Sequence, residues 1–139
     1  MRGMRFIILC FILSIVSPNP AFAQDDKTRK FFAVQEMVNS VQKNEKILYT
    51  VLLKRYFIEG VPYSATMMTV SPEHTFNIVQ TNDGFEALAL FRKEDVHKKA
   101  YKDNKDAEGI AKVKLKVFLD DIYLIFGHKE SGEQIKLYE

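Results

Sequence analysis

The sequence is poor in residue types that carry specialised chemistry, with one cysteine, six glycines and no tryptophan among its 139 residues. Cys10, the single cysteine, lies inside an apolar run near the N-terminus, where we interpret it as an apolar side chain. The rest of the chain therefore has no disulfide, no thiolate nucleophile and no cysteine ligand for a metal. The scarcity of glycine also argues against a glycine-rich phosphate-binding loop.

Residues 1–23 have the parts of a secretory signal peptide. Two arginines precede residues 6–16, an uncharged apolar stretch that is too short to cross a bilayer as a helix, which takes roughly 20 residues. Ala21 and Ala23 place small side chains at the two positions that signal peptidase requires. We therefore expect cleavage after Ala23, and the alternative is an uncleaved N-terminal anchor.

Cleavage at that position would leave residues 24–139, which we interpret as one domain. The formal net charge of +2 comes from the two arginines of the signal, so the remaining chain has equal numbers of basic and acidic residues. This balance argues against a nucleic-acid-binding protein. The lack of cysteine and of an Asn-x-Ser/Thr glycosylation site favours a bacterial source. We therefore expect export to the periplasm or to the exterior.

Residues 27–44 predict an amphipathic helix, because their apolar residues recur at helical spacing. Asp25 and Asp26 suit the start of this helix, where carboxylates accept free backbone N–H groups, and Lys43 suits its end. One apolar stripe must therefore pack on another apolar surface. The stripe consists of Phe31, Val34, Met37, Val38 and Val41.

Residues 47–58 have two interpretations. Their leucines could continue the helical stripe, but β-branched and aromatic residues dominate the segment and favour a strand. We prefer the strand, which Gly60 and Pro62 would end.

Turn residues divide the rest of the chain into strands and one polar helix. Residues 93–109 are acidic first and basic later, which predicts a solvated helix that Gly109 terminates. Residues 82–84 and 130–132 predict hairpin turns. The expected strands are 63–70, 75–81, 85–92, 111–119, 121–127 and 133–139.

The predicted fold class is α+β. We expect an N-terminal amphipathic helix packed on a curved antiparallel sheet of about six to seven strands, with a second polar helix. In the order of its elements alone, this arrangement resembles the cystatin-like type of architecture. The resemblance carries no sequence motif, so it assigns no role to any residue.

Basic residues concentrate in one part of the chain, because residues 92–116 hold nine lysines and arginines against five acids. Three of them alternate with apolar residues on a predicted strand and so share one of its faces. This segment could recognise an acidic protein surface, lipopolysaccharide or anionic lipid. The alternative is a row that only solvates a sheet face or protects an edge strand. The candidate binding residues are Lys112, Lys114 and Lys116 on the strand and Lys98, Lys99 and Lys102 on the polar helix.

The three histidines all fall in predicted turns or on the polar helix; they are His74, His97 and His128. Asp95 and Glu130 each stand two positions from a histidine, which is the basis of a hydrolase hypothesis. A catalytic or zinc site would need these groups to converge in a cleft. We interpret all three histidines as surface residues and expect no metal and no cofactor.

Asp120 and Asp121 form a pair of carboxylates between two predicted strands. Such a pair can act as acid and base when burial separates the two pKa values. In a turn both groups stay solvated, so we expect them to accept local backbone N–H groups instead.

Three functions remain open for this sequence. The first is a small non-enzymatic protein that binds another macromolecule through its surface, as an inhibitor, immunity or accessory protein does. The second is a carrier that holds an apolar ligand between helix and sheet, and the third is the hydrolase. The residues that could line a carrier's cavity are Met67, Met68, Phe76, Phe85, Phe91, Phe118 and Phe126.

Overall fold

The computed structural model describes residues 20–92 and 97–139, with side chains from residue 26 onward. The predicted signal peptide lies outside the described residues apart from its last four positions. In this described part of the chain, no helix is long and apolar enough to cross a membrane.

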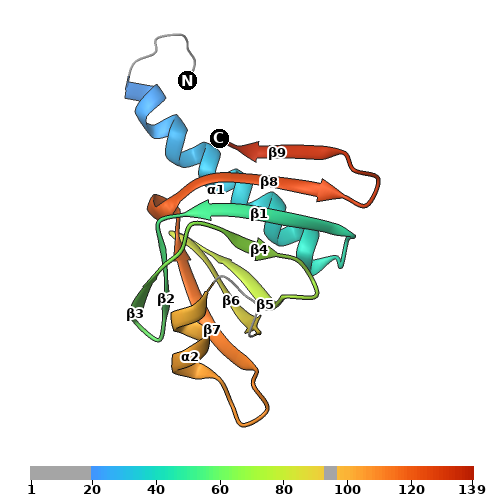
Figure 1. Ribbon diagram of the computed structural model, residues 1–139. Coiled ribbons are helices and arrows are strands. Elements are labelled where there is room, and N and C mark those ends of the chain that lie inside the picture. Colours follow the sequence, from blue (N-terminus) through green and yellow to red (C-terminus); the bar gives the residue numbers. More distant parts are fainter. Residues whose placement is uncertain (1–19, 93–96) are drawn as a thin grey trace, which may run out of the picture.

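The described residues form two helices and nine strands (Figure 1). Helix α1 spans Pro20–Gln42 and helix α2 spans Lys98–Asn104. The strands are β1 (Ile47–Leu53), β2 (Arg55–Ile58), β3 (Val61–Ser64), β4 (Met68–Val70), β5 (Thr75–Thr81), β6 (Gly84–Phe91), β7 (Ala111–Phe118), β8 (Ile122–Lys129) and β9 (Gln134–Tyr138), and a short 3₁₀ turn, η1 (Leu119–Asp121), joins β7 to β8. One sheet has the order β4-β1-β8-β9 and the other β3-β2-β7-β6-β5. Every strand pair is antiparallel.

The predicted α+β class, with a helix on antiparallel strands and a second short helix, is confirmed. The strands divide between a four-stranded and a five-stranded sheet, whereas we predicted about six to seven strands in one. The difference arises because two expected strands each break in two. Residues 47–58 are strand rather than helix, as predicted, but they form β1 and β2, and residues 63–70 contribute to β3 and β4.

Two bends in the chain lie side by side and separate the two sheets. The first is at Lys54, between β1 and β2, and the second is η1, between β7 and β8. Because β1 pairs with β8 and β2 pairs with β7, the β1–β2 segment and the β7–β8 segment pass from one sheet to the other at the same place. The backbone N–H of Lys54 donates to the carbonyl oxygen of Asp121 at 2.7 Å, which joins the two bends.

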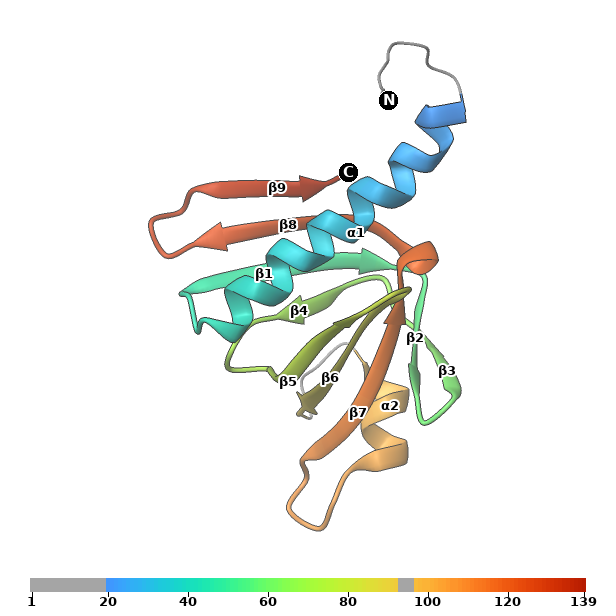
Figure 2. The same cartoon turned by 180° about the vertical axis from the view of Figure 1, so that it is seen from behind.

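Helix α1 lies across the inner faces of both sheets (Figure 2). Val34, Met37 and Val38 of the predicted stripe are buried in the core that the two sheets share. Side-chain amides fix the helix on β5, because Gln42 donates to the carbonyl of Ile78 at 2.9 Å and Gln80 donates to the carbonyl of Phe31 at 3.0 Å. These bonds and the apolar stripe determine which face of each sheet is covered.

The predicted start of the first helix is wrong. Helix α1 begins at Pro20, five residues before Asp25. Proline is favoured at the first helical position, where its missing N–H is not needed and its φ already fits. Asp26 therefore lies within the helix, where it accepts a hydrogen bond from the Tyr138 hydroxyl and tethers β9.

The strand predicted over residues 47–58 ends at Ile58, before Gly60, as expected. Pro62 itself lies inside β3, opposite Phe57, because β3 is an edge strand where no partner requires the missing N–H. The predicted end of the second helix is wrong. Gly109 does not end a helix, since α2 already stops at Asn104. Gly109 instead turns the following loop at φ +82°, and its carbonyl accepts a hydrogen bond from the Tyr101 hydroxyl at 2.8 Å.

The start of β6 depends on a glycine. A Cβ placed on Gly84 would lie 1.8 Å from the carbonyl oxygen of Val117 on β7. We predict that Gly84→Ala lowers the free energy of unfolding, measured by urea denaturation, by about 2–3 kcal/mol. The reason is that the added methyl group forces the backbones of β6 and β7 apart. Gly60→Ala is the control, since Gly60 has a φ of +82° but no atom within 4 Å of its Cβ position, so it tests backbone strain without a close approach. Equal losses in the two variants would contradict the close approach.

The junction between the sheets contains a buried carboxylate. Arg55 donates from Nε to Asp121 Oδ2 at 3.3 Å, and the side chain of Asp121 is 7% exposed. We predict that Arg55→Ala lowers the free energy of unfolding by about 1–3 kcal/mol in urea denaturation, because the carboxylate stays buried without its cation. Lys46→Ala removes an ion pair whose two side chains are both exposed, so it should cost less than about 1 kcal/mol. A smaller loss for Arg55→Ala than for Lys46→Ala would contradict this role.

Candidate functional site

The outward face of the five-stranded sheet combines basic and apolar side chains. The alternation of β7 sends Val113 and Leu115 into the core and Lys112 and Lys114 to the opposite side, as predicted. Both helices pack on the core side, so neither covers this outward face. We call it the lysine face; it consists of Phe57, Phe76, Val79, Glu86, Leu88, Leu90, Lys112, Lys114, Lys116 and Phe118.

The strand register places the apolar members of the lysine face beside its lysines. Leu88 lies directly opposite Lys114 on one side and Phe76 on the other, and Leu90 lies opposite Lys112. Phe76 is 39% exposed. An apolar strip therefore runs along the basic row.

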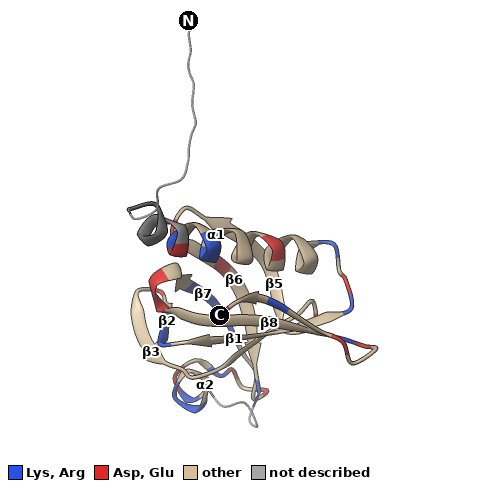
Figure 3. Ribbon diagram, turned by 90° about the horizontal axis from the view of Figure 1, so that it is seen from above, with Lys and Arg blue, Asp and Glu red and all other residues tan. Residues whose placement is uncertain are grey.

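The three lysines of β7 differ in their partners. Lys116 donates to Thr81 and Asp83, and it lies over the ring of Phe118 at 5.0 Å. These hydrogen bonds, Lys116 first and Thr81 second, lower the pKa of the Asp83 carboxyl. Lys112 and Lys114 are exposed, and within the described residues they form no ion pair. The positive charge that a partner can meet is therefore concentrated on these two lysines of β7 (the basic residues of β7 are blue in Figure 3).

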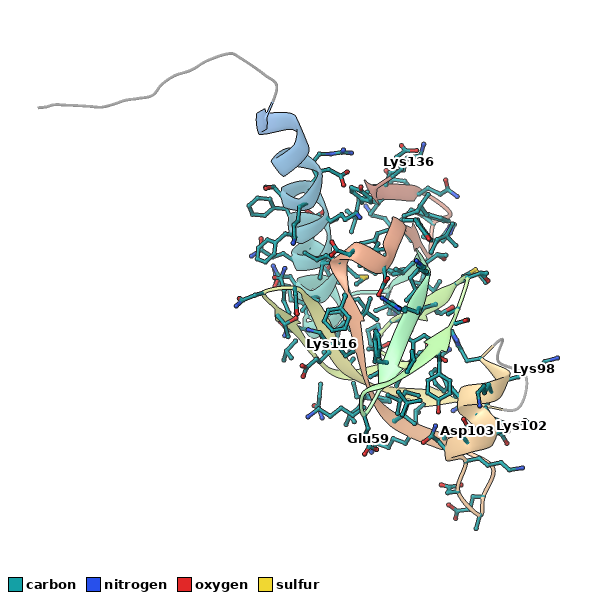
Figure 4. All side chains as sticks on the ribbon, turned by 90° about the vertical axis from the view of Figure 1, so that its left-hand side faces the viewer. Glu59, Lys98, Lys102, Asp103, Lys116 and Lys136 are labelled. Carbon is teal, nitrogen blue, oxygen red and sulfur yellow. The ribbon has the colours of Figure 1, made fainter. Side chains whose placement is uncertain are left out.

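The structure does not bring the other candidate lysines to this face. Helix α2, which carries Lys98, Lys99 and Lys102, packs on the core side of β7. Figure 4 shows Lys98 and Lys102 away from Lys116. Lys99 forms an ion pair with Asp103 at 3.2 Å. Asp103 also accepts a hydrogen bond from Tyr63 at 2.9 Å, and Tyr63 first and Lys99 second lower the pKa of that carboxyl. The six lysines therefore form two separate groups.

The interpretation of all three histidines as surface residues is wrong for His97. It is 8% exposed, and its ring stacks on Phe91 with centroids 4.9 Å apart and meets the Tyr56 ring edge-on at 5.1 Å. His74 and His128 are half-buried. Burial of His97 follows from long-range packing between α2, β2 and β6, which a polar local sequence does not reveal.

Of the two histidine–carboxylate pairs of the hydrolase hypothesis, His128 with Glu130 is the one that lies wholly within the described residues, and its members have other contacts. Glu130 lies 3.8 Å from Lys46 in an ion pair, and His128 packs its ring against Phe126. Asp95 lies outside the described residues. In the described part of the chain, no group of three or more histidine, cysteine or acidic side chains could hold a metal ion.

The expectation of two solvated carboxylates in a turn is wrong for Asp121. Asp120 is exposed, but Asp121 is 5% exposed and bonded to Arg55. The turn is the η1 junction between the sheets, so its backbone and one of its side chains are enclosed by β1 and β2.

A cavity of about 190 Å³ lies between the sheets, and Leu90 is the one residue that its lining shares with the lysine face. Four of the residues proposed for a carrier's cavity line it, whereas Phe76, Phe118 and Phe126 lie on outward faces. His74 and His97 were not predicted to line it. They come from separate turns, and no spacing in the sequence could have paired them. The lining residues are Met67, Met68, Thr69, His74, Thr75, Phe85, Ala89, Leu90, Phe91, His97 and Leu115.

Comparisons with protein-family models, curated proteins and solved structures found no match for this chain.

Tyr56, Tyr63, Phe91 and His97 form an aromatic cluster, of which Phe91 and His97 also line the cavity. This cluster makes the free energy of unfolding depend on pH. Burial raises the pKa of the Tyr56 hydroxyl well above its ordinary value, with a smaller contribution from Tyr63. In the unfolded chain this hydroxyl ionises near pH 10, so its contribution to stability is complete below about pH 10 and is lost as the pH rises further. We predict that the urea midpoint falls between about pH 10 and 11.5 and that Tyr56→Phe flattens this decline.

The control for this prediction is Tyr123→Phe, because the Tyr123 side chain is 59% exposed and lies outside the aromatic cluster. Its alkaline decline should match that of the unmodified protein. An unchanged decline in Tyr56→Phe would contradict the assignment to Tyr56.

Proposed function

We propose that this chain is an exported, non-enzymatic protein whose lysine face binds an acidic surface of another protein, as an inhibitor, immunity or accessory protein does. The observation that carries the proposal is the apolar strip of Phe76, Leu88 and Leu90 beside two exposed lysines without ion pairs. An apolar centre with charged residues beside it is the usual composition of a protein interface.

Charge complementarity favours an acidic partner. Lys112 and Lys114 meet no acidic side chain of their own chain within the described residues, and Glu86, the one acid of the lysine face, lies opposite Lys116. An approaching acidic surface would therefore find a net positive charge at the end of β7 that is nearer Ala111. Such complementarity accelerates association and selects among partners.

A membrane surface fits these observations less well. A lysine near an anionic bilayer contributes about 1 kcal/mol, so two unpaired lysines supply about 2 kcal/mol. Even millimolar affinity requires about 4 kcal/mol. Leu88 and Leu90 are half-buried, so only part of the apolar strip can enter a bilayer.

The experiment is site-specific photo-crosslinking with the full chain in cells of its source. A photoreactive phenylalanine at position 88 lies at the centre of the lysine face, and one at Leu48, on the outward face of the four-stranded sheet, is the control. We expect a protein adduct at position 88 whose crosslinked segment is acidic. Lys112→Glu with Lys114→Glu should reduce it at least tenfold.

The double variant Lys98→Glu with Lys102→Glu reverses the same amount of charge on α2 and should leave the adduct unchanged. Loss of the adduct in both double variants, or none at position 88, would overturn the proposal. Flotation with phosphatidylglycerol vesicles tests the alternative partner. Binding that Lys112→Glu with Lys114→Glu abolishes would replace the acidic protein with an anionic membrane.

A second candidate function, carriage of a small apolar ligand, is favoured by the interior cavity. Its volume of about 190 Å³ limits the cargo to about one ring, because an apolar cavity of about 150 Å³ holds benzene. Long acyl chains and steroids are therefore too large for it.

A further inference from the structure

The interior cavity has an apolar body formed by the inner faces of β6 and β7. Phe85, Ala89, Phe91 and Leu115 line it and are themselves buried, and they come from adjacent strands of one sheet. Met68 of the other sheet closes it from the opposite side. Methionine adapts to irregular shapes, which suits the wall of a binding cavity.

One end of the cavity is polar. His74 lines it, and its Nδ1 lies 2.8 Å from the Oγ of Ser71, a residue that is 6% exposed. This bond orients the imidazole and occupies Nδ1, which leaves Nε2 as the ring nitrogen that can meet a ligand. Thr75, also 6% exposed, adds a hydroxyl to the lining.

The described lining contains no lysine, arginine, aspartate or glutamate. A fully charged ligand would gain no ion pair from these described residues when it loses its hydration, whereas a neutral ligand needs none. Met67 lines the cavity but is 42% exposed, which places the entrance beside it.

We infer that this cavity binds a small neutral molecule, about one aromatic ring in size, whose single hydroxyl group forms a hydrogen bond with His74. The ring fills the apolar body between Phe85, Phe91 and Leu115, and the hydroxyl lies at the polar end. On β7 this site and the lysine face use opposite sides of the strand, and Leu90 of β6 is the one residue that they share, so the inference does not rest on the protein partner proposed above.

The test is a titration of the full chain, labelled with ¹³C in its methionine methyl groups, with phenol and with toluene. The two probes have nearly the same size, and only phenol carries a hydroxyl. We expect saturable shifts of the Met67 and Met68 methyl signals, while the signal of Met37, which is buried on α1 and is not part of the lining, stays in place. Phenol should bind about five- to tenfold more tightly than toluene, the effect of one hydrogen bond.

Two variants locate the site. Ala89→Leu fills the cavity and should abolish the shifts with both probes, and His74→Leu should remove the preference for phenol while toluene still binds. His128→Leu is the matched control, since His128 is equally half-buried but lies on the outward face of the four-stranded sheet.

Absence of saturable shifts at Met67 and Met68, or an unchanged preference for phenol in His74→Leu, would overturn the inference. If circular dichroism shows that Ala89→Leu does not fold, the comparison of phenol with toluene in His74→Leu still tests the inference. Lys112→Glu with Lys114→Glu should bind phenol normally, so failure of the cavity and failure of the lysine face are distinguishable.

Discussion

The arrangement of both sheets depends on the junction at Asp121, where its carbonyl accepts the N–H of Lys54 and its buried carboxylate meets Arg55. These contacts hold two chain bends side by side, so that β1 and β8 enter one sheet while β2 and β7 enter the other. Straight strands at this point would give one sheet with its apolar face on one side only. The bends instead turn two inner faces toward a common core, which α1 completes.

Strand β7 connects the two proposed sites, because its side chains alternate between them. Leu115 lines the cavity, and Lys114 and Lys116, its neighbours in sequence, belong to the lysine face. Period-two alternation therefore gives one strand a side that lines the cavity and a side that forms the lysine face. One lysine of this face also stabilises the fold, since Lys116 donates a hydrogen bond to Asp83 and so joins β7 to the turn before β6.

The polar residues whose positions we predicted incorrectly share one cause. His97 lies in a polar segment that, taken alone, indicates a solvated helix, and Asp121 lies in a pair of carboxylates that indicates an exposed turn. His97 is enclosed because Tyr56 of the distant strand β2 meets its ring together with Phe91, and Asp121 is enclosed because the bend at Lys54 lies against it. Their burial depends on contacts across dozens of residues, so no local pattern could predict it.

The sequence alone determined the features that depend on local periodicity and turn chemistry: the apolar stripe of α1, the alternation of β7 and the turn before Gly84. It also determined the α+β class, because these patterns define elements and their order. Only the tertiary structure decided that residues 47–58 divide between two sheets, that the two groups of lysines lie apart and that His74 reaches the cavity. These outcomes depend on which distant segments pair, and hydrogen bonds and packing between strands determine that pairing after the local elements have formed.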